Sequence, residues 1–142
     1  MKAVLDCNGI LSALIRPGGP PALILAAMLR QEFELVLSPA ILAEYRRAVN
    51  YPKIRMRLLL SAKELRELEE NILVLAFWVE PAAISRPLVA ADPSDDAYLL
   101  AAAEGEADCG VSGDHHLLTL KTYEGIPIIS PRDFLQTREQ KP

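Results

Sequence analysis

Short apolar segments with little polar alternation recur along the chain, and segments with a helical pattern lie between most of them. Strands of this kind are typically buried on both faces, as in parallel sheets. The alternation of strands and helices implies the same arrangement, with helices packed on both faces of the sheet. The sequence therefore predicts an α/β fold, with strands at Lys2–Leu5, Glu34–Leu37, Ala76–Val79, Cys109–Ser112 and Ile126–Ile129.

Local capping signals place the helices between these strands. Ser38–Pro39 supplies an N-cap followed by proline at the first helical position. Ser61 and Glu64 form a capping-box signature, in which Glu64 reaches back to the N-cap amide. The expected helices run from Pro20 to about Arg30, from Ser38 to about Val49, from Ser61 to about Leu75 and from Asp95 to Glu104, with a last short helix after Ser130–Pro131.

The size and composition predict one domain over residues 1–142, with a short C-terminal tail from about residue 136. Apolar residues make up 51% and charged residues 24% of the chain, as in an ordinary globular domain. No window resembles a membrane span, and Asp6 interrupts the first apolar run too early for a signal peptide. We therefore expect a cytoplasmic protein. Cys7 and Cys109 have neither zinc nor disulfide spacing, and we expect reduced, mostly buried thiols.

Acidic residues lie at or near the carboxyl ends of the predicted strands, where open parallel sheets bind ligands. Asp6 ends the first strand, and Asp114 follows the strand that begins at Cys109. Glu44 lies on the helix after the second strand, and Asp95 opens the helix after the Asp92-Pro93-Ser94 turn. Segments far apart in sequence therefore bring carboxylates to one edge of the sheet.

Carboxylates this close together repel one another, so such a pocket needs a cation or protonated acids. Oxygen donors without Cys or His at metal spacing favour Mg²⁺ or Mn²⁺. A bound ion of this kind lowers the pKa of a water and stabilises a leaving oxygen, which is the chemistry of phosphodiester hydrolysis. We therefore predict that Asp6, Glu44, Asp95 and Asp114 are metal-binding catalytic acids.

Each acid also has a simpler explanation, so the prediction rests on the set. Glu44 resembles many surface glutamates on helices, and Asp95 and Asp96 both suit the first turn of a helix through its dipole. Asp92 precedes a proline, as residues that start turns often do. Asp114 is also a suitable N-cap for the segment that contains Leu117–Leu118.

Polar residues beside these acids have supporting roles in the same interpretation. Asn8 and Ser112 are placed to orient carboxylates or metal-bound water, although both are also common turn residues. His115 and His116 follow Asp114 directly. They are candidates for a contact with phosphate or metal, and surface imidazoles at a helix start are the simpler reading.

Together, these segments resemble the PIN-domain family, and the resemblance extends from Met1 to about Phe134. Within the family, the chain looks most like the VapC-like toxins of prokaryotic toxin–antitoxin systems. Cys7 stands where a Thr is common, and His115-His116 replaces a commoner basic-then-Asp pair. The segments that carry the resemblance are Val4-Leu5-Asp6-Cys7-Asn8, Leu37-Ser38-Pro39 leading to Glu44, Asp92-Pro93-Ser94-Asp95-Asp96 and Val111-Ser112-Gly113-Asp114.

The resemblance implies a three-layer α/β/α sandwich around a parallel sheet of about five strands. It implies a Mg²⁺- or Mn²⁺-dependent endoribonuclease, a homodimer, and a cognate antitoxin that blocks the site. The spacing of the family pattern favours Asp95 over Asp96 as the third acid. The implied site consists of the metal-binding acids Asp6, Glu44, Asp95 and Asp114, with Asn8, Ser112, Asp92 and Asp96 in support.

A basic segment supplies candidates for binding RNA. The net charge of −4 argues against nucleic-acid binding, and a solvated helix face is the simplest account of a basic run. However, an acidic pocket repels a polyanion, so a substrate needs cations nearby. No acid lies between Tyr45 and Lys63, and within this segment we predict that Arg46, Arg47, Lys53 and Arg55 contact RNA.

Three other interpretations compete with a nuclease. The first is a catalytically silent PIN-like module that regulates or binds another protein. The second is a phosphatase or receiver domain; the former needs a second Asp two residues after Asp6, where Asn8 stands. The third is a purely structural α/β protein, which Mn²⁺ would not stabilise.

Overall fold

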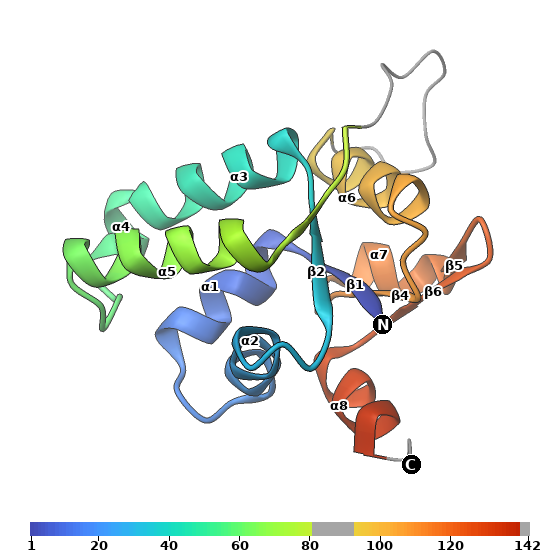
Figure 1. The fold of residues 1–142 in the computed structure, drawn as a ribbon, viewed down its shortest axis with the longest axis horizontal. Helices are drawn as coiled ribbons and strands as arrows, with labels where there is room; N and C mark the ends of the chain where they lie inside the picture. Colours follow the sequence, from blue (N-terminus) through green and yellow to red (C-terminus); the bar gives the residue numbers. More distant parts are fainter. Residues whose placement is uncertain (81–92, 140–142) are drawn as a thin grey trace.

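The computed structural model describes residues 1–80 and 93–139 and contains a six-stranded sheet, in the order β3-β2-β1-β4-β6-β5 (Figure 1). All neighbouring strands are parallel except β5 and β6. The central parallel sheet is therefore confirmed, and β5 adds a short antiparallel edge that the sequence did not predict. The strands are β1 (Lys2–Leu5), β2 (Glu34–Leu37), β3 (Phe77–Trp78), β4 (Cys109–Val111), β5 (Thr122–Tyr123) and β6 (Ile126–Ile129).

Helices pack on the sheet to give the predicted three-layer α/β/α arrangement (Figure 1). Helix α6 contacts β1, β2 and β4, while α2 contacts α1, α5 and α8. No single helix of the described ranges is long and apolar enough to cross a membrane; α1 and α2 pass that test only as a pair bent by 97°. The helices are α1 (Cys7–Ile15), α2 (Pro20–Leu29), α3 (Pro39–Asn50), α4 (Pro52–Arg55), α5 (Ala62–Leu75), α6 (Pro93–Glu104), α7 (His115–Leu120) and α8 (Pro131–Glu139).

The predicted caps are present. The Oγ of Ser38 accepts the N–H of Ile41 at 3.3 Å at the start of α3. Ser61 and Glu64 form both hydrogen bonds of the capping box at the start of α5. Asp114 caps α7 by accepting the N–H of His116 at 2.8 Å, as the alternative reading of that residue anticipated.

Helix α1 was not predicted, and it changes the position of Asn8. The helix begins directly after Asp6, which is its N-cap, so Asn8 lies in the first turn of a helix rather than in a loop. Helix α8 continues to Glu139 and so includes most of the tail expected from about residue 136. Strand β4 ends at Val111, one residue earlier than expected, and Ser112 follows the strand.

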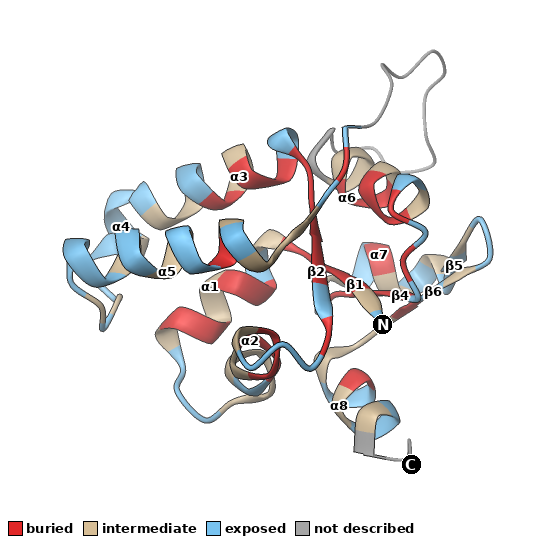
Figure 2. Ribbon diagram, viewed as in Figure 1, coloured by how far each residue is buried: buried red, intermediate tan, exposed pale blue. Residues whose placement is uncertain are grey.

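The core lies on both faces of the central strands (Figure 2). Val4, Val36 and Val111, on three adjacent strands, are each 1% exposed or less. Phe134 of α8 is completely buried and packs edge-on against Phe33, with ring centroids 5.1 Å apart. These central strands end in the polar residues that form the candidate site.

Candidate functional site

Asp6 is the most buried acid of the site. Its Oδ1 accepts the N–H of Gly9 at 2.8 Å, and its Oδ2 accepts the hydroxyl of Ser112 at 2.6 Å. Burial raises the pKa of Asp6 above its ordinary value, and the charge of Asp114 adds to this effect. The two hydrogen bonds oppose the shift because they stabilise the carboxylate form. Removing this acid from water therefore has a cost that a cation in the pocket would offset.

All of the predicted main acids line one pocket, which has a volume of about 220 Å³. Asp6 follows β1, Glu44 lies on α3, Asp95 lies in the first turn of α6, and Asp114 follows β4. The exposed side chain of Asn8, on α1, lines the same pocket. The structure thus brings together residues that are as far apart as positions 6 and 114 at the carboxyl edge of the sheet.

Ser112 joins two of these acids. Its hydroxyl donates to Asp6, and its Oγ also accepts the backbone N–H of Asp114 at 2.9 Å. Ser112 is completely buried, so its hydrogen bond to Asp6 is shielded from water. The predicted supporting role of Ser112 therefore has a structural basis: it fixes the position of one carboxylate relative to the backbone of the other.

Asp95 and Asp96, the two candidates for the third acid, differ in placement. Asp95 lines the pocket, whereas Asp96 is not among the residues that line it. The Oδ1 atom of Asp96 is buried and has no hydrogen-bond partner within residues 1–80 and 93–139. Of the two neighbours, Asp95 is thus the one that faces the site. Asp92 lies outside the described residues.

Cys7, which we expected to be a reduced, mostly buried thiol, is partly buried and forms part of the pocket wall together with Glu44. Its thiol donates to the backbone carbonyl of Glu44 at 3.8 Å. Burial raises the pKa of Cys7, the charge of Asp6 raises it further, and Arg47 opposes this shift. Arg47 also forms an ion pair with the carboxylate of Glu44, which places a basic side chain beside the acidic pocket.

The residues of this pocket fit a hydrated divalent ion better than a bare one. Among the described residues, no three His, Cys, Asp or Glu side chains converge closely enough to form a ready-made coordination cage. Mg²⁺ usually keeps several waters and binds proteins through one or two carboxylates. A pocket of about 220 Å³ has room for such an ion with part of its hydration shell, since one water occupies about 30 Å³ in the liquid.

Two buried tyrosines, Tyr45 and Tyr98, complete the wall of the pocket. Burial raises the pKa of each hydroxyl well above its usual value, and the charge of Asp6 is the next cause in both cases. Both hydroxyls therefore stay protonated at neutral pH. The Tyr45 hydroxyl donates to the backbone carbonyl of Leu5, at the end of β1. Tyr45 thus ties α3 to the strand that carries Asp6.

We expect Tyr45→Phe to lower the free energy of unfolding by about 1–2 kcal/mol, because it removes a buried hydrogen bond while keeping the ring. Urea denaturation of the metal-free protein measures this loss. An unchanged midpoint would mean that the contact with Leu5 contributes nothing to stability.

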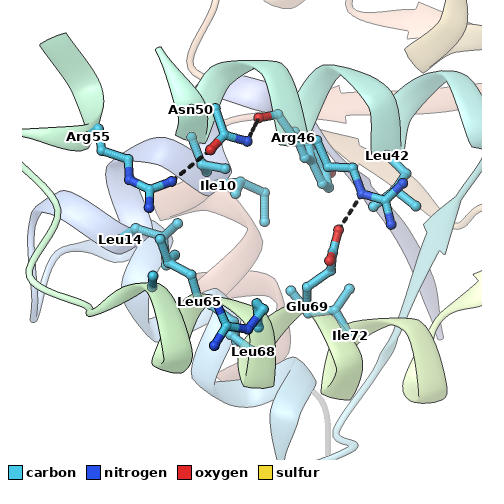
Figure 3. Close-up of a pocket in the computed structure, with 14 residues that line it drawn as sticks. Ile10, Leu14, Leu42, Arg46, Asn50, Arg55, Leu65, Leu68, Glu69 and Ile72 are labelled. Atoms are coloured by element: carbon cyan, nitrogen blue, oxygen red, sulfur yellow. Dashed lines mark hydrogen bonds and ion pairs between the residues drawn. The ribbon is translucent and has the colours of Figure 1, made fainter. Parts of the chain in front are cut away.

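The predicted RNA-binding arginines fall into two places. Arg46 and Arg55 line a separate hollow of about 280 Å³ between α3 and α5, whose walls are largely aliphatic (Figure 3). There Arg46 forms an ion pair with Glu69, and Arg55 donates to the Oδ1 of Asn50 at 2.7 Å. Lys53 is exposed on α4. Arg47 alone of the predicted arginines pairs with an acid of the carboxylate pocket.

The fold and the site define a class: an α/β protein whose parallel sheet carries an acidic pocket at its carboxyl edge. The family model described as PIN domain matches residues 2–116, and the chain belongs to this family, whose members are generally nucleases. The crystal structure of PAE2754 from Pyrobaculum aerophilum is similar in fold, with a TM-score of 0.63 and 17% sequence identity over 99% of this chain and 91% of that chain. A search of curated proteins finds no similar sequence.

Proposed function

We propose that this protein is a metal-dependent endoribonuclease that hydrolyses phosphodiester bonds of RNA, and that it is the toxin of a toxin–antitoxin pair. The observation that carries the nuclease activity is the convergence of Asp6, Glu44, Asp95 and Asp114 on one pocket. Membership of a family of nucleases gives the pocket its reaction class. The toxin role rests on the resemblance of the sequence motifs alone.

In this proposal the main acids would hold Mg²⁺ or Mn²⁺, with Asn8, Ser112, Asp92 and Asp96 in support. A bound ion of this type supplies an activated water and stabilises the leaving oxygen. The contribution of the chain itself is positioning. Ser112 and the N–H of Gly9 hold both oxygens of Asp6, and Arg47 holds Glu44. Catalytic groups are most effective when their own orientation is fixed in this way.

The toxin role brings further proposals about partners and location. We propose a homodimer in the cytoplasm and a cognate antitoxin that blocks the acidic pocket. Co-purification with the product of a neighbouring gene, followed by loss of RNA cleavage in the complex, tests the antitoxin. Light scattering of the purified protein tests the dimer.

A catalytically silent PIN-like interaction module is the second candidate. The observation in its favour is that the acids of the described residues do not converge into a coordination cage. The two candidates differ in one measurement, which is metal-dependent cleavage.

The decisive experiment incubates the purified protein with end-labelled RNA in EDTA, in Mg²⁺ and in Mn²⁺. We expect internal cleavage only when a divalent ion is present. The melting temperature is measured in the same buffers, because an ion that binds the folded state stabilises it by about 2.7 kcal/mol at 100 times its Kd. No cleavage of RNA together with no stabilisation by Mn²⁺ would favour the silent module and would contradict a metal site.

We expect Arg47→Ala to weaken RNA binding and to flatten its salt dependence. Each phosphate contact on single-stranded RNA contributes about 0.7 to the slope of log K against log salt. Arg47 pairs with Glu44 beside the pocket, whereas Arg46 pairs with Glu69 in the separate hollow, so the two arginines should be replaced one at a time. We expect the larger change in Arg47→Ala. Equal slopes of log K against log salt for the wild type and Arg47→Ala would show that Arg47 does not contact RNA.

A further inference from the structure

Exposed apolar side chains gather on the short helix α4 and the turns that flank it. Tyr51, Met56 and Leu59 are 57%, 86% and 67% exposed. They are three of the seven large apolar side chains that are exposed in the described part of the chain. Single apolar side chains on a surface need no explanation, whereas a group of them marks a place where a partner binds.

Cations without acidic partners lie among these side chains. Lys53 and Arg57 are exposed, and neither forms an ion pair within residues 1–80 and 93–139. No acid lies between Tyr45 and Lys63, so nothing in this segment repels an anion. Positive charge interleaved with apolar side chains is complementary to single-stranded nucleic acid, which offers both phosphates and the flat faces of bases. The two cations and the three apolar residues, Tyr51, Lys53, Met56, Arg57 and Leu59, form the α4 surface.

Two other cations of the same segment are held within the protein. Arg46 pairs with Glu69, and Arg55 donates to the Oδ1 of Asn50 (Figure 3). The Nδ2 of Asn50 in turn donates to the backbone carbonyl of Arg46 at 2.8 Å. These contacts give Arg46 and Arg55 a structural role, and they leave the cations of the α4 surface available to a ligand.

The α4 surface is fixed at a short distance from the acidic pocket. Tyr51 ends α3 and begins α4, and its carbonyl accepts the N–H groups of Ile54 at 3.0 Å and Arg55 at 2.8 Å. Helix α3 also carries Glu44 of the pocket, and α4 lies at the end of α3 that is farther from the sheet (Figure 1). Glu44 and Asn50 are six residues apart on α3, which corresponds to about 9 Å along the helix axis.

We propose that the α4 surface is a distal RNA-binding site, at which Tyr51 stacks on a base of single-stranded RNA while Lys53 and Arg57 contact its phosphates. This inference rests on the proposed RNA-cleaving function and adds its substrate class. A strand that reaches from the pocket to α4 extends at least about three nucleotides from the scissile bond, at the spacing of about 3.4 Å per nucleotide of a duplex strand. RNA is favoured over other anionic partners because the acidic pocket on the same helix takes a phosphodiester in the proposed function.

The test measures the binding of a fluorescently labelled single-stranded RNA by anisotropy, in EDTA and over a range of salt concentrations. The RNA has about 12 nucleotides, a length within the range of known single-strand sites. We expect Lys53→Ala combined with Arg57→Ala to flatten the slope of log K against log salt by about 1.4, since each phosphate contact contributes about 0.7. We expect Tyr51→Ala to weaken binding at least about fivefold and Tyr51→Phe to bind like the wild type, because stacking requires only the ring.

Lys121→Ala combined with Arg132→Ala is the matched control. Both side chains are exposed, and they lie after α7 and on α8, at the other side of the molecule from α4 (Figure 1). This pair removes the same charge as the variant of the α4 surface. An equal change of slope in the control would overturn the distal site, because net charge alone would then account for binding. Unchanged binding by Tyr51→Ala would overturn it as well.

Cleavage in Mn²⁺ distinguishes failure of the distal site from failure of the proposed function. For the labelled RNA we expect Tyr51→Ala to raise KM about fivefold with kcat unchanged, and we expect cleavage of a dinucleotide to be unaffected. Cleavage by the wild type without any effect of these variants on binding would overturn the distal site alone. Binding at the α4 surface without cleavage of RNA would overturn the proposed function instead. Binding of phosphatidylglycerol vesicles without binding of RNA would assign the surface to an anionic membrane and overturn the RNA site.

Discussion

Asp6→Asn is expected to abolish metal-dependent RNA cleavage while the protein stays folded. Asp6 is the acid that the structure fixes most tightly, through Gly9 and Ser112. Loss of a group that merely orients metal ligands reduces affinity or activity by about 10–100-fold, so we expect loss of a direct ligand to reduce cleavage by at least about a hundredfold. End-labelled RNA in saturating Mn²⁺ measures the rate. Full activity in the variant would contradict the assignment of Asp6 to the site.

Although Asp6→Asn should abolish cleavage, it should raise the free energy of unfolding of the metal-free protein. Burial raises the pKa of Asp6, so the folded protein binds this proton more tightly than the unfolded chain does. Stability therefore falls as the pH rises from the ordinary carboxyl range through the raised pKa of Asp6. An asparagine cannot ionise, and Asp6→Asn should be more stable than the wild type at neutral pH in EDTA. At a pH where Asp6 is protonated in the wild type, this advantage should disappear.

Urea denaturation in EDTA at neutral and at acid pH measures this difference. Asn8→Ala is a suitable comparison, because it changes an exposed side chain of the same pocket without removing a charge. A stability difference between wild type and Asp6→Asn that is the same at both pH values would show that the ionisation of Asp6 is not its cause.

Gly110→Ala is expected to be the most destabilising glycine-to-alanine change in the described part of the chain. The added Cβ would lie 2.4 Å from the hydroxyl oxygen of Tyr98 and 3.1 Å from Cζ. Both residues are buried between α6 and the sheet, so the ring has little freedom to move away. Overpacking of this kind costs about 1–3 kcal/mol. We expect a loss at the upper end of this range, together with a displaced α6.

Two further variants make this prediction specific. Gly113→Ala is the control, since a Cβ at position 113 has no neighbour within 4 Å. This variant should leave the free energy of unfolding nearly unchanged. Gly110→Ala combined with Tyr98→Phe removes the closest contact and should recover part of the loss. Urea midpoints of the single and double variants form a double-mutant cycle. Additive effects in that cycle would contradict a direct clash between the two residues.

The strands and most helices could be predicted because their signals are local. The capping residues Ser38 and Ser61 and the apolar strands are visible within a few residues of sequence. Helix α1 was missed because its first turn contains Asn8 and Gly9, which are poor helix formers. Tertiary packing accounts for this helix, since α1 packs against α2 and α3 and buries Ile10, Ala13 and Leu14.

The acids of the site could be predicted because the topology of parallel sheets brings strand ends together. The contributions of Tyr98 and Cys7 could not. The setting of Tyr98 depends on Gly110, which lies on a strand that follows α6, and the thiol of Cys7 donates to a carbonyl on α3. Such contacts depend on helix positions that sequence periodicity does not specify. The sequence offered one signal for Tyr98, which is its position three residues after Asp95 on the same helix.

The hydrogen bond between Asp6 and Ser112 also constrains when the pocket can form during synthesis. The two residues are 106 positions apart, and β1 lies beside β4 in the middle of the sheet. A nascent chain that has not yet released β4 from the ribosome has neither the partner of Asp6 nor Asp114. Pairings between residues this distant form late and slowly. A nuclease built in this way would remain inactive on the ribosome until most of its chain had emerged.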